Sequence, residues 1–111
     1  MTLIESNFVL IRTAVPVAGA SKVREAMGAA GAGQQGNYSH CSGSHASTGR
    51  FIPLEGAHPA IGQIGQPEEV IEETIEMMCH KDLVENVVLA LRGAHPYEEP
   101  PIDILPRYDI K

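Results

Sequence analysis

One pattern of apolar residues occurs twice along this chain: a strand-like alternation followed directly by a helical stripe. The first copy runs from Phe8 to Ala30 and the second from Val70 to Leu91. Two such halves, each continued by a further strand, follow the split βαβ plan of ferredoxin-like folds. We therefore expect an α+β fold with a four-stranded antiparallel sheet. Right-handed crossovers would place both helices on one face of that sheet.

The first half begins with a strand over residues 8–15, which are rich in β-branched side chains. Alternation puts four of these side chains on one face, namely Val9, Ile11, Thr13 and Val15. Pro16 ends the strand because proline has no backbone N–H for the ladder. A helix is expected over residues 18–30, where four residues recur at helical spacing: Val23, Ala26, Met27 and Ala30.

The second half repeats this order. Residues 70–79 favour a strand, although their glutamates would also suit a helix. A helix is expected to begin near Asp82. Its apolar stripe consists of Leu83, Val84, Val87, Val88 and Leu91. Gly93 is expected to end this helix, and Ile102–Leu105 is expected to form a short last strand.

The segment between the two halves is rich in glycine, serine and alanine. Asn37–Cys41 and Arg50–Pro53 favour two short strands, and Gly43–Gly49 would be the loop between them. This pair is a predicted β-hairpin extension of the sheet. Residues 55–67 are then expected to form an ordered loop, because three glycines and two prolines punctuate them.

A sheet with both helices on one face leaves its other face bare, and the strands predicted here carry apolar residues on both faces. A large exposed apolar surface is unusual for a monomer. We expect burial of this face against other copies of the chain. The alternative is that residues 43–67 fold over it within one chain.

Composition narrows the classes of function. A chain of 111 residues accommodates one domain, residues 1–111. Its net charge of −6 and the absence of a Lys/Arg cluster argue against nucleic-acid binding and against membrane-surface binding. The cysteines, Cys41 and Cys79, do not form a disulfide framework. The first apolar run, Phe8–Ile11, is too short for a signal core, so we expect a cytoplasmic protein.

Five ordered segments carry a family resemblance: residues 31–42, 49–53, 55–59, 61–65 and 94–100. They resemble the PII-like domain inserted in YqfO-type members of the NGG-interacting-factor (dinuclear-metal, GTP cyclohydrolase type-2-like) family. The resemblance runs from about Phe8 to Tyr108. The segment His95–Glu98 also resembles CutA divalent-cation-tolerance proteins, which have the same ferredoxin-like plan and form tight trimers.

The resemblance implies a PII/CutA-like fold, a homotrimer, and a non-enzymatic binding or regulatory role with ligand sites between subunits. The ligand would be a small molecule or a metal ion, and a protein partner is compatible with the role of a lid or regulator. One alternative is a CutA-like protein that binds a divalent or copper ion. A nucleotide hydrolase is the least expected function, because the two-metal site of the larger family lies in a flanking domain whose motifs are absent from these residues.

The first candidate site is the dense group of soft metal ligands at His40, Cys41 and His45. Imidazole and thiolate groups suit zinc, copper or nickel. In a strand, His40 and Cys41 would face opposite sides, so a shared ion would require a bulge or a ligand from another chain. The alternative is that Tyr38 and His40 pack in a subunit interface. Asn37, Tyr38 and His40 are also candidate ligand-binding residues.

The second candidate site is the segment from His95 to Pro101, where three prolines restrict the backbone. Such rigid placement suits a binding site, because groups that are held in advance lose less entropy on binding. His95, Tyr97 and Glu98 are therefore candidate ligand-binding residues, and His95 is also a candidate metal ligand. The alternative is a structural elbow that leads the chain into its last strand.

Overall fold

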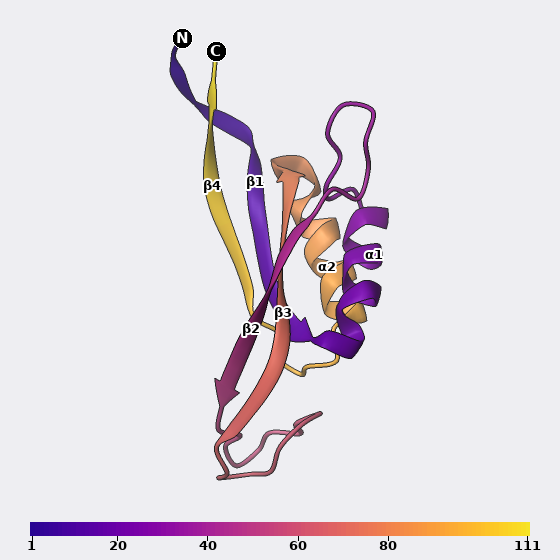
Figure 1. Ribbon diagram of the computed structural model, residues 1–111, viewed down its shortest axis with the longest axis vertical. Helices are drawn as coiled ribbons and strands as arrows, with labels where there is room; N and C mark the ends of the chain where they lie inside the picture. The colour runs from indigo at the N-terminus through magenta and orange to yellow at the C-terminus, as the bar shows by residue number, and fades with distance from the viewer.

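The computed structural model describes all residues from Met1 to Lys111 and shows one antiparallel sheet with two helices on one face (Figure 1). The strands are β1 (Leu3–Pro16), β2 (Gly43–Phe51), β3 (Glu68–His80) and β4 (Ile102–Ile110). The helices are α1 (Ala20–Ala29) and α2 (Val84–Ala94), preceded by the short 3-10 turns η1 (Val17–Gly19) and η2 (Lys81–Leu83). The strand order β2-β3-β1-β4 confirms the predicted ferredoxin-like sheet.

The core lies between the helices and the two central strands. Ile11 of β1 and Met77 of β3 are direct partners in the ladder and are both fully buried. The rest of the buried apolar core is Val9, Val15, Ala20, Val23, Met27, Ala32, Ile75, Cys79, Val87 and Leu91. Complete burial of a side chain such as Ile or Leu stabilises the fold by about 1.5–3 kcal/mol. The alternation predicted for the first strand is confirmed, because Val9, Ile11, Thr13 and Val15 are all buried on the helix side.

The strands are much longer than the helices that cover them. β1 has 14 residues and α2 has 11, which correspond to roughly 46 Å and 16 Å. The molecule is accordingly elongated, with extents of 52 × 25 × 24 Å. A ribbon of β1 and β4 projects at the end that carries both termini, where the Lys111 N–H donates to the Thr2 carbonyl over 2.9 Å. A ribbon of β2 and β3 projects at the opposite end (Figure 1).

The predicted β-hairpin extension is wrong. Residues 43–49 do not form a loop but are the main part of β2, which pairs with β3 from Gly43–Glu76 to Phe51–Glu68. Composition suggested a loop, whereas long-range pairing along the sheet edge makes these small residues a strand. Gly49 is required in this strand, since an ideal Cβ there would lie 2.2 Å from the Glu72 Oε1 atom.

Residues 37–41 are not a strand either, because the chain reverses sharply between α1 and β2. Gly33 has φ +76° and His40 has φ 58°, both in the left-handed region. Gln35 and Tyr38 exchange two backbone hydrogen bonds across a tight turn. The turn is attached to the sheet at its base, where the Gly33 N–H donates to the Met78 carbonyl over 2.6 Å.

Other element ends also differ from the prediction. The first strand begins at Leu3, five residues before the predicted start at Phe8. The last strand continues past Leu105 to Ile110, and Pro106 is tolerated in it because β4 is an edge strand. The second helix passes through Gly93 and ends at Ala94. His95 precedes a proline and is extended, with φ −77° and ψ 136°, since Pro96 disfavours the helical conformation for the residue before it.

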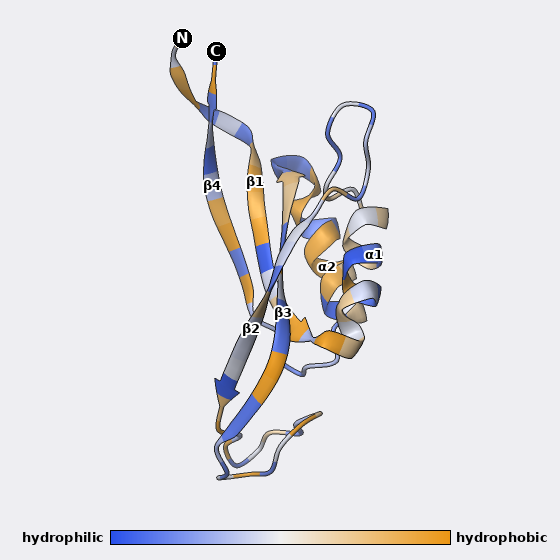
Figure 2. Ribbon diagram, viewed as in Figure 1, coloured by the Kyte–Doolittle hydropathy of each residue, from blue (hydrophilic) through white to orange (hydrophobic).

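The predicted bare face is present on the side of the sheet without helices. Phe8, Leu10, Met78 and Leu105 lie on this face and remain half-buried. Figure 2 shows apolar segments continuing along β1 and β4, away from the helices. The alternative that residues 43–67 fold over the whole face is not observed, because β2 extends the sheet and residues 52–67 lie at its end (Figure 1). Neither helix combines the length and apolarity needed to span a membrane.

The turn between α1 and β2 predicts a difference between two glycine substitutions. Gly33→Ala and Gly36→Ala both place a side chain in the left-handed region, which costs about 1–2 kcal/mol. At Gly33 the new Cβ would also lie 2.4 Å from the Cys41 carbonyl oxygen, whereas Gly36 has open space. Gly33→Ala should therefore reduce the free energy of unfolding by roughly 1–3 kcal/mol more than Gly36→Ala. Urea denaturation at matched protein concentration measures this difference, and equal losses would contradict the described backbone contact.

Candidate functional site

The segment His95–Pro101 links α2 to β4 and turns around the end of β1. Pairing between β1 and β4 starts at Thr13 and Ile102, so the Ala14 carbonyl has no partner from β4. The His95 ring fills this position, with its Nε2 atom 2.7 Å from the Ala14 carbonyl oxygen. This contact secures the linking segment to the edge of β1, as expected for the elbow considered in the sequence.

His95 is buried, with 6% of its surface exposed, and both of its ring nitrogens have partners. Its Nδ1 atom accepts the Tyr97 backbone N–H over 3.0 Å. Nε2 therefore carries the proton and donates to Ala14, which defines a neutral tautomer. Burial lowers the pKa of His95, although the Ala14 carbonyl and the nearby Glu72 charge oppose this effect. Both ring nitrogens are thus engaged within the chain, so a metal ion at His95 would have to replace one of these hydrogen bonds.

Tyr97 extends from the elbow to Glu72 on the helix-free side of β3. The neighbouring Glu73 pairs with Arg24 of α1, so Glu72 points to the opposite face. The Tyr97 hydroxyl donates to Glu72 Oε2 over 2.5 Å, and Glu72 is only 4% exposed. Burial, together with the hydrogen bond to Glu72 and its charge, raises the pKa of Tyr97 above its ordinary value. The phenol therefore stays protonated and holds the carboxylate in a fixed position.

Residues 52–67 form an ordered loop beside this pair. Internal hydrogen bonds stabilise the loop, including one from the Gly65 N–H to the Pro53 carbonyl over 2.7 Å. The backbone N–H of His58 donates to Glu98 Oε2 over 3.0 Å, which joins the loop to the elbow. The prediction of an ordered loop here is confirmed. Two segments from different halves of the chain thus meet at one end of the sheet.

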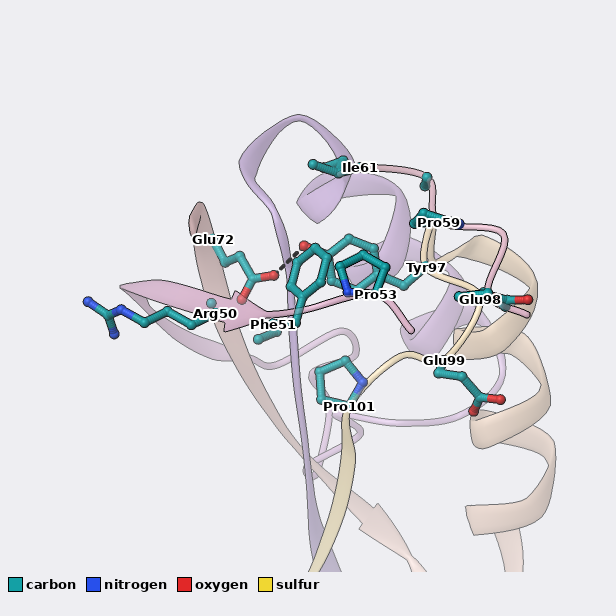
Figure 3. Close-up of a pocket in the computed structure, with 14 residues that line it drawn as sticks. Arg50, Phe51, Pro53, Pro59, Ile61, Glu72, Tyr97, Glu98, Glu99 and Pro101 are labelled. Atoms are coloured by element: carbon teal, nitrogen blue, oxygen red, sulfur yellow. Dashed lines mark hydrogen bonds between the residues drawn. The ribbon is translucent and has the colours of Figure 1, made fainter. Parts of the chain in front are cut away.

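The loop, the elbow and the sheet enclose a pocket of about 470 Å³ (Figure 3). This volume lies in the range of small-molecule sites. Tyr97 and Phe51 form an edge-to-face pair at its base, with ring centroids 6.0 Å apart. The pocket is lined by Ala14, Gly49, Arg50, Phe51, Pro53, Ala57, Pro59, Ala60, Ile61, Glu72, Tyr97, Glu98, Glu99 and Pro101.

The other predicted site lies at the opposite end of the helix pair. The His40 ring packs directly on Gly28, near the C-terminal end of α1, where a Cβ at position 28 would lie 2.0 Å from the ring. Its Nδ1 atom is 3.0 Å from the Ser39 hydroxyl, and its Nε2 atom is 3.5 Å from a Glu25 carboxylate oxygen. Tyr38 is 74% exposed at the tip of the turn. His40 is thus partly held by α1, while Tyr38 projects into solvent.

The candidate metal ligands do not come together in one chain. His40 and Cys41 lie near the C-terminal end of α1, and His45 is exposed on β2. His95 lies near the N-terminal end of α1, where Pro96 adjoins Gly19, so roughly 13 Å of helix separates the two regions. Nowhere in the chain do three or more His, Cys, Asp or Glu side chains form a metal-binding group. His40, Cys41 and His45 therefore form no shared metal site within one subunit, and His95 lies in a separate region.

Comparison with known proteins places this geometry in context. No family model matches the chain. A GTP cyclohydrolase 1 type 2 homologue from Mycobacterium bovis is 48% identical over 90 residues, which cover 81% of this chain and 24% of the relative. A crystal structure of a Bacillus cereus protein related to NIF3 superposes with a TM-score of 0.78 at 41% identity, covering 96% of this chain and 27% of that protein.

The chain is homologous to one segment of these proteins. It spans about a quarter of the length of the curated relatives that it matches. CutA from Synechococcus elongatus has a TM-score of 0.67 at 17% identity and covers 96% of this chain and 82% of CutA, which shows a shared fold. The family resemblance and the CutA-like, ferredoxin-like architecture expected from the sequence are therefore confirmed.

Within this CutA-like domain, sequence reasoning identified only part of the pocket. Tyr97 and Glu98 line it as predicted ligand-binding candidates, whereas Asn37, Tyr38 and His40 lie elsewhere. Glu72 was missed because the glutamates of β3 resemble a solvated strand face. The available signal was its place on the strand face opposite the core, beside two glycine- and proline-rich segments.

The Tyr97–Glu72 contact predicts a stability loss in Tyr97→Phe. Removing the hydroxyl leaves a buried carboxylate oxygen without its donor, which typically costs about 1–3 kcal/mol. Tyr38→Phe is the matched control, because Tyr38 is 74% exposed and the substitution should change stability by less than about 0.5 kcal/mol. Chemical denaturation of both variants tests the contact. Equal effects would mean that the hydroxyl does not stabilise Glu72.

The buried neutral His95 predicts a component of acid sensitivity. Because its pKa is lower in the folded state, the unfolded chain takes up the proton first as the pH falls below about 6.5. The contribution of neutral His95 is therefore fully present above that pH and is lost towards pH 5. His95→Gln should show a smaller loss of unfolding free energy between pH 7.5 and pH 5 than the wild type. Denaturation curves at both pH values measure this, and identical losses would count against the assignment.

Proposed function

We propose that the chain is a non-enzymatic binding or regulatory module that works as a homotrimer and binds a small molecule in the pocket between residues 52–67 and the elbow. The observation that carries this proposal is the construction of the pocket. A loop with its own hydrogen bonds and a proline-rich elbow are joined through His58 and Glu98. Together they close over a buried carboxylate, Glu72.

The helix-free face supports assembly. Phe8, Leu10, Met78 and Leu105 leave apolar surface open across the middle of the sheet. The projecting ribbons add further exposed apolar residues, which are Leu3, Ile52, Ile71, Tyr108 and Ile110. Two-stranded ribbons are marginally stable by themselves, so contact with other copies would stabilise both ends of the molecule. The resemblance to CutA proteins, which form trimers, favours three copies.

The position of the pocket supports a ligand site at a subunit boundary. β2 is an edge strand, and its last residues, Gly49, Arg50 and Phe51, form part of the pocket wall. The backbone of an edge strand has unpaired N–H and C=O groups that can pair with another chain. A second copy against β2 would therefore lie beside the pocket, and a bound ligand would affect its contacts with this edge.

The chemistry of the lining supports binding in preference to covalent catalysis. The pocket presents carboxylates, one guanidinium and one phenol, and its lining includes no Ser, Cys, His or Lys side chain. Nucleophilic catalysis requires an activated nucleophile beside a base. The raised pKa of Tyr97 keeps its hydroxyl protonated, as a hydrogen-bond donor to Glu72. The site is thus arranged to hold and orient a ligand.

The assembly predicts opposite outcomes for two matched substitutions. Leu10→Glu places a charge on the helix-free face, whereas Leu89→Glu places one on the outer surface of α2, where Leu89 is 61% exposed. Light scattering after size-exclusion chromatography should give three times the 11.9 kDa chain mass for the wild type and for Leu89→Glu. Leu10→Glu should shift towards single chains, because burial of an unpaired charge is costly. A wild-type monomer, or a trimer unaffected by Leu10→Glu, would refute assembly through this face.

A further inference from the structure

The Glu72 carboxylate is only half satisfied within the chain. Oε2 accepts the Tyr97 hydroxyl over 2.5 Å, and no donor of the chain reaches Oε1. Glu72 is 4% exposed and lines the pocket. Oε1 occupies the space beside Gly49 that a side chain at that position would otherwise fill. Oε1 is not fully enclosed, because the Thr13 hydroxyl is the one enclosed polar side-chain atom that lacks a partner. It is therefore open to a donor from a ligand in the pocket.

Besides Glu72, the pocket lining contains two more acidic side chains and one basic side chain. Glu98 and Glu99 stand on the elbow side, as Figure 3 shows. Arg50 is the one cation in the lining, and its Nε atom already pairs with Glu69 over 2.8 Å. The lining thus carries three carboxylates, of which Glu98 and Glu99 are exposed and point away from Glu72, and one guanidinium that is engaged with Glu69. The pocket favours positive ligands and disfavours phosphorylated ones.

The walls around this acidic group are apolar. Phe51, Pro53, Ile61 and Pro101 surround the space next to Glu72 (Figure 3). Two aromatic rings, Phe51 and Tyr97, lie together at its base, and aromatic faces attract cations. The Tyr97 hydroxyl holds the carboxylate in place before binding, which lowers the entropy that a ligand must lose.

We infer that the pocket binds a small organic cation, an amine, amidine or guanidinium with an apolar or aromatic body, whose N–H groups donate to Glu72. This inference rests on the proposed ligand-binding function and specifies its chemical class. The cationic group would supply the donor that Oε1 lacks, and the body would pack between Phe51 and the prolines. A charge-assisted hydrogen bond of this type is stronger than one between neutral groups.

Three probes of similar shape and different charge test the inference: benzamidine, benzamide and benzoate. Titration of the 111-residue chain at pH 7.5, followed by NMR chemical shifts, should give a benzamidine Kd of about millimolar, as expected for a fragment. Benzamide should bind at least about tenfold more weakly than benzamidine, and benzoate should show no saturable binding. Glu72→Gln should weaken benzamidine binding by about tenfold or more.

The controls separate charge recognition from folding and assembly. Gln at position 72 keeps an acceptor for the Tyr97 hydroxyl, so the variant should retain the wild-type thermal midpoint and oligomeric mass. Glu85→Gln makes the same charge change at an exposed position of α2 and should bind benzamidine as the wild type does.

Three results would overturn the inference. Benzamide or benzoate binding as tightly as benzamidine would show a pocket without cation preference, and the broader ligand-binding proposal would stand. Unchanged benzamidine affinity in Glu72→Gln would place the probe elsewhere. Absence of benzamidine binding, with a change of oligomeric mass in Glu72→Gln, would mean that a basic side chain of another copy occupies the pocket.

Discussion

A single sheet with both helices on one side can bury only one of its two faces. That constraint follows from the handedness of the two crossovers, and most of the remaining architecture depends on it. The helix side takes the fully buried residues of the central strands, such as Ile11 and Met77. The other side keeps Leu10 and Met78 only half-covered. The same side receives the Glu72 carboxylate, where the loop and the elbow can enclose it without disturbing the core.

Much of the fold could be predicted from the sequence because its signals are local. Alternation in residues 8–15 and helical spacing in the two stripes identified the central strands, both helices and their order. The middle segment was misread, because the conformation of β2 is determined by pairing with β3 and not by its own composition. A run such as Gly43–Gly49 resembles a loop in isolation. Only its partner strand, with Glu72 occupying the space beside Gly49, makes its small residues necessary.

The site was harder to predict because its parts are distant in sequence. The prolines around Tyr97 marked a rigid segment, and that local signal led to two true lining residues, Tyr97 and Glu98. The partner of Tyr97 is Glu72, which lies 25 residues earlier on β3, and no spacing rule connects the elbow to that strand. Histidine density was a poor guide for a related reason. His95 uses both ring nitrogens to bind the backbone of its own chain, so it supports the pocket without entering its lining.

The paired termini have a mechanical consequence. Thr2 and Lys111 are joined at the tip of the β1–β4 ribbon, at the other end of a molecule 52 Å long from the β2–β3 ribbon. If further polypeptide were joined to both termini, it would therefore enter and leave the domain at the same end. Such an attachment leaves the pocket near the opposite end of the molecule, away from the joined termini. Longer proteins that contain a homologous segment can therefore carry such a domain as an insertion that projects from the rest of the chain, with its sheet intact.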